Sequence, residues 1–218
     1  MEKRIRQIIH HIVLELIGIV LVSIGGAGIM KIALGTGPYD ALSMSISSIT
    51  AIRIGTIGLI NNFICVALQM ILLKREYKPI YLLQIPVSFL IGWIINLFYY
   101  TIFASMNPSL YVVRLLLLFV FIIICAYGDA MVTASGFVGL ALESACMIFA
   151  KRLNIEFGKI RQYADVIFIA IICVLWLLFR AEFAMREGTI ILAITFGPLL
   201  GFFTKHLNTV FQKWIYDR

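Results

Sequence analysis

The stretch GGAGIMKIALGTGPYDALSMSISSITAIRIGTIGLINNF, residues 25–63, holds the end of one long apolar run, a break, a short segment and the start of a second long run. Gly35 and Gly37 permit a tight turn at the break, and Pro38 suits the first position of a helix. A helix from Pro38 to Ala51 would have about 14 residues and a length of about 21 Å, which is too short for about 30 Å of hydrocarbon. The sequence therefore predicts a re-entrant or interfacial helix between two spans.

Outward from this stretch, six apolar runs are long enough to be transmembrane helices, which need about 20 residues each. They cover approximately Ile12–Ala33, Thr56–Leu73, Ile80–Phe103, Tyr111–Val132, Ile160–Phe179 and Gly188–Phe203. A second short helix is predicted at about Val138–Ala150. We therefore expect residues 1–218 to form a single all-α membrane domain with about six transmembrane helices and two short re-entrant or interfacial helices.

Composition favours the bilayer as a partner and argues against a soluble domain. Of the residues, 62% are hydrophobic and 13% are charged, whereas soluble domains are typically about 45–50% apolar and about 25% charged. The net charge of +7 comes from Lys and Arg that lie between the apolar runs, so we interpret it as a topology signal and expect no nucleic acid partner. Since Lys and Arg collect on the cytoplasmic side of membranes, their distribution places both termini in the cytoplasm.

The two halves of the chain share a pattern that predicts an internal duplication. Residues whose numbers differ by 103 match without a gap over residues 25–62: Gly25 with Gly128, Asp40 with Glu143, Gly55 with Gly158, and Asn62 with Asp165. A further insertion of six residues matches Gly92 with Gly201. We expect a first repeat at 12–103, a second at 111–204 and a basic cytoplasmic tail at 205–218. Because each repeat has three spans, the second enters the membrane from the opposite side, and transporters of this kind bind substrates near the midplane between the repeats.

The motif Gly35-Thr36-Gly37-Pro38-Tyr39-Asp40, followed by a helix and by G-T-x-G at Gly55–Gly58, resembles the YczE/YitT group of bacterial membrane proteins. Gly158-Lys-Ile-Arg161 with Asp165, and later Gly188-Thr189, are similar to the second-half signature of that group. The resemblance covers nearly the whole chain. It implies a multi-pass protein of the bacterial cytoplasmic (inner) membrane, and it implies no substrate.

Asp40 and its repeat mate Glu143 are the first candidates for a binding site. The N-terminus of a helix favours negative charge, so Asp40 can simply stabilise the start of its own helix. Alternatively, both carboxylates face a shared polar cavity and bind a cation, a proton or a substrate amine. An ionisable residue at membrane depth is costly and is by default a functional hypothesis, although Glu143 can also lie at headgroup level.

Four more polar residues complete the candidate set. Arg161 and Asp165 are four apart on one helix face and form either a structural ion pair or a gate and carboxylate clamp. Asn62 contributes either to a polar layer at the pseudo-two-fold axis or to a helix–helix hydrogen bond. Asp129 lies deep in the fourth span. Outside this set, we expect Lys31 and Arg114 to snorkel to the interface.

The sequence favours a small transporter or permease, driven by ions or protons, with its site at the repeat interface. No P-loop, H-E-x-x-H or G-x-S-x-G motif is present, so we expect no enzyme activity, no cofactor and no metal site. The alternative is a non-transporting accessory or scaffold protein that binds a protein partner through its tail, where Phe211 and Trp214 lie. A small-molecule or ion substrate stays unidentified, and a homodimer stays open. We expect Glu15 to pair with an N-terminal Lys or Arg.

Overall fold

The computed structural model describes the backbone of residues 2–216 and the side chains of residues 9–209, and this part contains helices and no strands. The main helices are α1 (Glu2–Ile32), α2 (Pro38–Thr50), α3 (Ile54–Leu73), α4 (Gln84–Leu97), α5 (Tyr111–Ser135), α6 (Ala141–Leu153), α7 (Phe157–Phe179) and α8 (Glu187–Tyr216). Short helices η1 (Lys74–Glu76), η2 (Pro79–Leu83) and η3 (Phe98–Ile102) flank α4. Six helical segments are long and apolar enough to cross a membrane, and α2 and α6 are shorter. The predicted all-α class with six spans and two short helices is confirmed.

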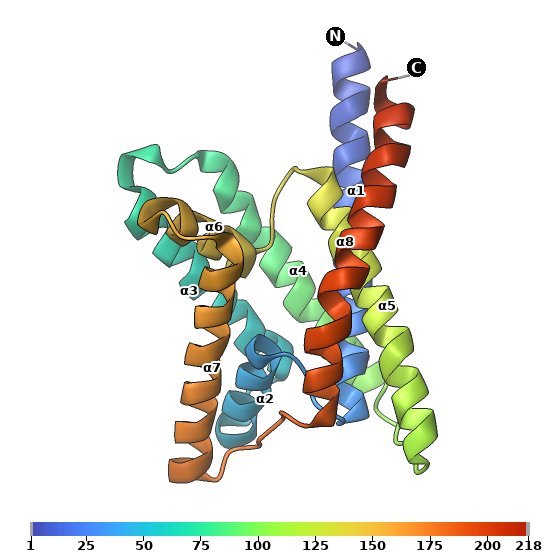
Figure 1. Cartoon of the computed structure of the whole chain (residues 1–218), viewed down its shortest axis with the longest axis vertical. Helices are drawn as coiled ribbons and strands as arrows, with labels where there is room; N and C mark the ends of the chain where they lie inside the picture. The colour runs from blue at the N-terminus through green and yellow to red at the C-terminus, as the bar shows by residue number, and fades with distance from the viewer. Residues whose placement is uncertain (1, 217–218) are drawn as a thin grey trace.

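The helices form two groups that are joined along α1 and α4 (Figure 1). In the first group, α5 packs along α1 on one side and along α8 on the other. In the second group, α2 and α6 lie against both α3 and α7, and α4 packs on α3 and α1. The Glu2 end of α1 and the Tyr216 end of α8 lie at the same end of the molecule, at the top of Figure 1. This arrangement agrees with both termini on one side of the membrane.

Helix boundaries recur at the offset of 103 residues that the sequence pattern contains. Helix α6 (Ala141–Leu153) has the bounds of α2 (Pro38–Thr50) shifted by 103 residues, and the ends of α1 and α5 and the starts of α3 and α7 obey the same shift. Helices α1 and α5 run in opposite directions, as do α3 and α7 (Figure 1). The second short helix is predicted to start at about Val138, but α6 starts three residues later, at Ala141. Gly136 ends α5 in the left-handed conformation, and the connector continues to Leu140.

A pair of basic side chains links α1 to α5 at both ends. The guanidinium of Arg114, near the start of α5, donates hydrogen bonds of 3.1 and 2.6 Å to the carbonyl of Ile32 at the end of α1. Its mate at the 103-residue offset is His11, whose Nδ1 donates at 2.6 Å to the carbonyl of Ser135 at the end of α5. Arg114 thus satisfies a helix end, which leaves orphan carbonyls, and does not simply snorkel. Glu15 accepts hydrogen bonds from the Ser135 hydroxyl and the Val138 amide. The N-terminal Lys and Arg side chains with which Glu15 is expected to pair lie outside the described residues.

The contact between α1 and α5 is made by glycines. A methyl group added at Gly25 would lie 2.6 Å from Cβ and 2.7 Å from the amide nitrogen of Cys125. One added at Gly128 would lie 2.6 Å from the amide nitrogen of Val22. Small residues let membrane helices approach at backbone distance, so α1 and α5 form the closely packed centre on which the two repeats meet.

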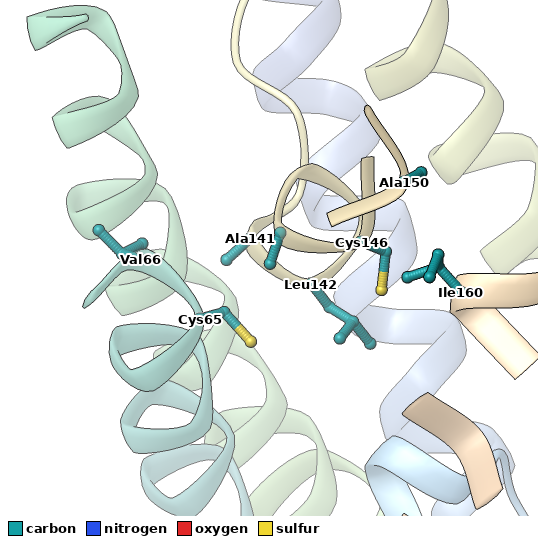
Figure 2. Packing of buried hydrophobic residues seen from close by; sticks show 8 residues of the cluster. Cys65, Val66, Ala141, Leu142, Cys146, Ala150 and Ile160 are labelled. Carbon is teal, nitrogen blue, oxygen red and sulfur yellow. The ribbon is translucent and has the colours of Figure 1, made fainter. Parts of the chain in front are cut away.

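The short helix α6 is held in place by apolar and polar contacts with its neighbours. Figure 2 shows Cys65 of α3, Leu142 and Cys146 of α6, and Ile160 of α7 gathered in one buried cluster. Beside it, the fully buried amide of Gln69 donates to Gln84 at 2.9 Å and to the carbonyl of Ala141, the first residue of α6, at 3.0 Å. These contacts fix the helix start that carries Glu143.

The other short helix, α2, is fixed by the connector between α7 and α8. The Ser45 hydroxyl donates to the carbonyl of Glu182 at 2.6 Å, and the amide of Thr36 donates to the carbonyl of Ala184 at 3.1 Å. The carbonyl of Leu34 accepts a 2.7 Å hydrogen bond from the amide of Gly188. Each short helix is therefore positioned by segments from the opposite half of the chain.

Candidate functional site

The break before α2 has the geometry that its sequence predicts. Gly35 has a φ of +114°, which side chains rarely tolerate, and Gly37 is the extended N-cap residue before Pro38 at the start of the helix. Asp40 therefore lies in the first turn of α2 and Glu143 in the first turn of α6. The carboxylate of Asp40 makes no hydrogen bond among the described residues, so it does not accept a hydrogen bond from the free amides at the start of α2.

Four carboxylates of the predicted site lie within electrostatic reach of the Arg161 guanidinium. Arg161 of α7 forms the ion pair with Asp165 that their spacing predicts. The charge of the same guanidinium also acts on the carboxylates of Asp40, Asp129 and Glu143, which come from α2, α5 and α6. All five side chains are partly buried. The structure thus gathers four carboxylates and one cation from four helices that belong to both repeats.

Asn62 lies in the same region but has a structural partner. Its Oδ1 accepts a 2.7 Å hydrogen bond from the hydroxyl of Tyr39, which links α3 to α2. The Tyr39 ring packs on Phe168 of α7, with ring centroids 5.5 Å apart. Tyr39 is not among the site residues that the sequence predicts, although it precedes Asp40 in the helix-break motif. Its hydroxyl and ring place an aromatic side chain next to the charged cluster.

Glycines occupy the repeat positions that correspond to two of the charged residues. At the 103-residue offset, Asp129 corresponds to Gly26 and Arg161 to Gly58. Gly26 is buried, yet a methyl group added there would meet no atom within 4 Å, and one added at Gly58 would meet only the Ser43 hydroxyl at 4.0 Å. One repeat therefore contributes charged side chains, and the other has unfilled space at the equivalent positions.

The two short helices, which are not among the six spans, carry carboxyl groups with altered acidity. Burial raises the pKa of Asp40 from its ordinary value of 3.8 to about 6, although the nearby charge of Arg161 lowers it and that of Glu143 raises it. Burial also raises the pKa of Glu143, and Arg161 again opposes the effect. Groups with pKa values near the ambient pH can exchange protons during function, so Asp40 is suited to proton exchange.

We expect Asp40→Asn to flatten the dependence of thermal stability on pH. Because the pKa of Asp40 is higher in the folded protein than in the unfolded chain, the folded state binds more protons between about pH 4 and 6. The contribution of Asp40 to the free energy of unfolding therefore decreases as the pH rises from about 4 to about 6. The asparagine variant has no group that titrates here, so its stability does not decrease in this way. Unfolding midpoints of the wild type and the variant are measured at pH 4.5 and at pH 7. If the midpoints of the two proteins differ by the same amount at both pH values, the prediction is wrong.

Metal binding has no support among the side chains of residues 9–209. No group of three or more His, Cys, Asp or Glu side chains is arranged there to hold a metal ion. The four cysteines are free thiols, with Cys65 and Cys146 buried in the cluster of Figure 2.

Comparison with known proteins identifies a family and no characterised relative. The family model described as "Family of unknown function (DUF6198)" matches residues 9–205. No curated protein and no solved structure matches the chain.

Proposed function

We propose that this chain, which belongs to the family of unknown function DUF6198, is a small ion- or proton-coupled transporter with its site between two inverted repeats. The observation that supports this is the convergence of Asp40, Asp129 and Glu143 around Arg161, from both halves of a six-span bundle. The relation to the YczE/YitT group, the bacterial inner membrane location, the cytoplasmic termini and the lack of enzyme activity are parts of the same proposal.

The cluster around Arg161 holds more negative than positive charge. A charged side chain at membrane depth costs several kcal/mol, and a structural role would pair each carboxylate with its own cation. Here Arg161 is engaged by Asp165, while Asp40 and Glu143 have no ion-pair partner in the described part of the chain. Carboxylates that outnumber the cation near them are suited to bind a further cation or a proton that arrives and leaves.

A ligand screen tests the proposal. Purified protein is heated at pH 5 to 8 with Na⁺, K⁺, methylammonium or small carboxylates, alongside Asp40→Asn and Glu143→Gln. A ligand at 100 times its Kd stabilises the native state by about 2.7 kcal/mol. We expect at least one probe to raise the unfolding midpoint of the wild type and to leave both variants unshifted.

The control is Glu187→Gln, which neutralises an exposed carboxylate at the start of α8 and should respond as the wild type does. A probe that is shown to bind is then tested for uptake into proteoliposomes. If no probe shifts the wild type, or if both variants respond fully, the two carboxylates do not form a binding site.

A second candidate function is a non-transporting scaffold that binds a partner near its C-terminus. It is favoured by one observation, namely that α8 continues beyond its predicted span end at Phe203 to Tyr216. The predicted tail, 205–218, is therefore a continuation of the helix as far as Tyr216, whereas the side chains of Phe211 and Trp214 lie outside the described residues. Under this alternative, truncation after Thr204 would abolish partner binding, and Asp40→Asn would have no effect.

A further inference from the structure

The two halves of the molecule differ in one helix contact. In the first half, α3 and α4 pack closely along each other. Their counterparts in the second half, α7 and α8, make at most marginal contact and lie apart in Figure 1. The two repeats therefore differ at one contact: the second and third spans touch in the first repeat (α3 and α4) and are separated in the second (α7 and α8).

Glycines mark both the closed contact and its open counterpart. Gly55 of α3 and Gly92 of α4 are buried, and a methyl group added at Gly92 would lie 2.5 Å from the carbonyl oxygen of Gly55. The repeat mates of these residues are Gly158 on α7 and Gly201 on α8. Both are exposed, and a methyl group added at either would meet no atom within 4 Å. The second half thus has the residues for a close helix crossing but not the crossing itself.

The polar groups of the closed crossing correspond to charged residues at the open one. In the first half, Oδ1 of Asn96 on α4 accepts a 2.9 Å hydrogen bond from the amide of Gly55, and its Nδ2 donates at 3.1 Å to the Thr56 hydroxyl. At the offsets that relate the glycines, Asn96 corresponds to Lys205 on α8 and Thr56 to Lys159 on α7. Both lysines are exposed. The open crossing therefore carries two positive charges where the closed crossing has a hydrogen bond.

A hollow lies on the Gly201 face of α8. It has a volume of about 670 Å³, and its lining includes Thr133, Gly197, Leu200, Gly201, Thr204 and Lys205. Thr133 is four residues, or about one helical turn, from Asp129 on α5. The open side of α8 therefore lines a hollow whose α5 residue, Thr133, is one helical turn from Asp129 of the charged cluster.

We propose that α7 and α8 form a gate that closes through a crossing of Gly158 on Gly201, as α3 and α4 are closed at Gly55 and Gly92. Closure occludes the hollow and brings Lys159 and Lys205 close together, and the α3–α4 crossing opens in the exchanged state. Such an exchange of conformation between inverted repeats gives alternating access. The inference rests on the proposed transport function for its purpose, but its test requires no substrate.

Cross-linking tests the gate. The variant Gly158→Cys/Gly201→Cys, reconstituted in lipid, is treated with a short bifunctional thiol reagent, and intramolecular linkage is measured by mass spectrometry. The control is Gly158→Cys/Phe202→Cys, because Phe202 is 67% exposed and lies about 100° around the helix from Gly201. A closed state that is populated at only about 0.1–10% is trapped progressively by irreversible linkage. The wild type measures the background linkage of the native cysteines. We expect the Gly201 pair to be linked far more than the control pair and far more than this background.

Charge reversal provides a second measurement on the same pair. Lys205→Glu replaces the repulsion from Lys159 by an attraction and should raise the rate of linkage, and the added change Lys159→Glu should lower it again. Equal linkage of the Gly201 and Phe202 pairs, or no linkage of either in monodisperse protein, overturns the gate. If the Gly201 pair is linked but no probe stabilises the wild type in the ligand screen, the gate stands and the transport site fails. If a probe stabilises the wild type but the Gly201 pair is not linked, the site stands and the gate fails.

Discussion

Gly25→Ala will lower the unfolding midpoint of the purified protein, whereas Gly26→Ala, one residue further along α1, will leave it unchanged or raise it. The methyl group at position 25 would lie 2.6 Å from Cβ of Cys125, so α1 and α5 would have to separate. Overpacking of this kind typically costs about 1–3 kcal/mol, and larger side chains such as Leu at this position should prevent isolation of folded protein. At position 26 no atom lies within 4 Å.

The two positions are adjacent in one helix, so the gain in helix propensity from glycine to alanine, about 1 kcal/mol, is the same for both substitutions. Any difference between them therefore reports the α1–α5 contact and not helix propensity. Thermal unfolding in detergent, followed by size-exclusion chromatography of heated samples, measures both variants. Equal midpoints would show that α1 and α5 are not in backbone contact, and the central packing described above would be wrong.

Arg161→Gln will destabilise the protein strongly at pH 8 and much less at pH 5. The substitution leaves the carboxylates of Asp40, Asp129, Glu143 and Asp165 without the cation that they share. Removing one partner of a buried ion pair costs about 3–5 kcal/mol, which is an upper bound here because Arg161 and Asp165 remain 27% and 30% exposed. Without the guanidinium the pKa of Asp40 rises above about 6, so acidification neutralises the repulsion.

Two variants serve as controls for Arg161→Gln. Arg180→Gln removes an exposed arginine at the end of α7 and should behave as the wild type does at both pH values. Asp165→Asn removes one carboxylate while Arg161 still faces the other three, so its loss of stability should be smaller. An equal loss for Arg161→Gln at pH 5 and pH 8 would mean that the guanidinium acts by packing and not by charge.

Much of the candidate site was predictable because Asp40 and Glu143 are related by a sequence offset that needs no structure. Helix starts depend on local signals such as Gly37-Pro38, so α2 was located to within a residue. At α6 the equivalent signal is absent, so the sequence predicts helix for apolar connector residues that the structure places before the helix start at Ala141. Tyr39 was missed because an aromatic residue in an apolar chain gives no signal until its hydroxyl is seen to donate to Asn62.

Sequence by itself determined the class of the protein, the number of spans and the duplication, because hydrophobic length and residue spacing are properties of the linear chain. Only the tertiary structure decided that the charge of Arg161 acts on the carboxylates of three other helices, and that Arg114 and His11 bind opposite helix ends. It also decided that α7 and α8 are apart while α3 and α4 are in contact. Two repeats with matching glycines encode the same crossing twice. Which of the two is closed depends on how the helices pack in three dimensions, and that information is not present in the spacing of residues along the chain.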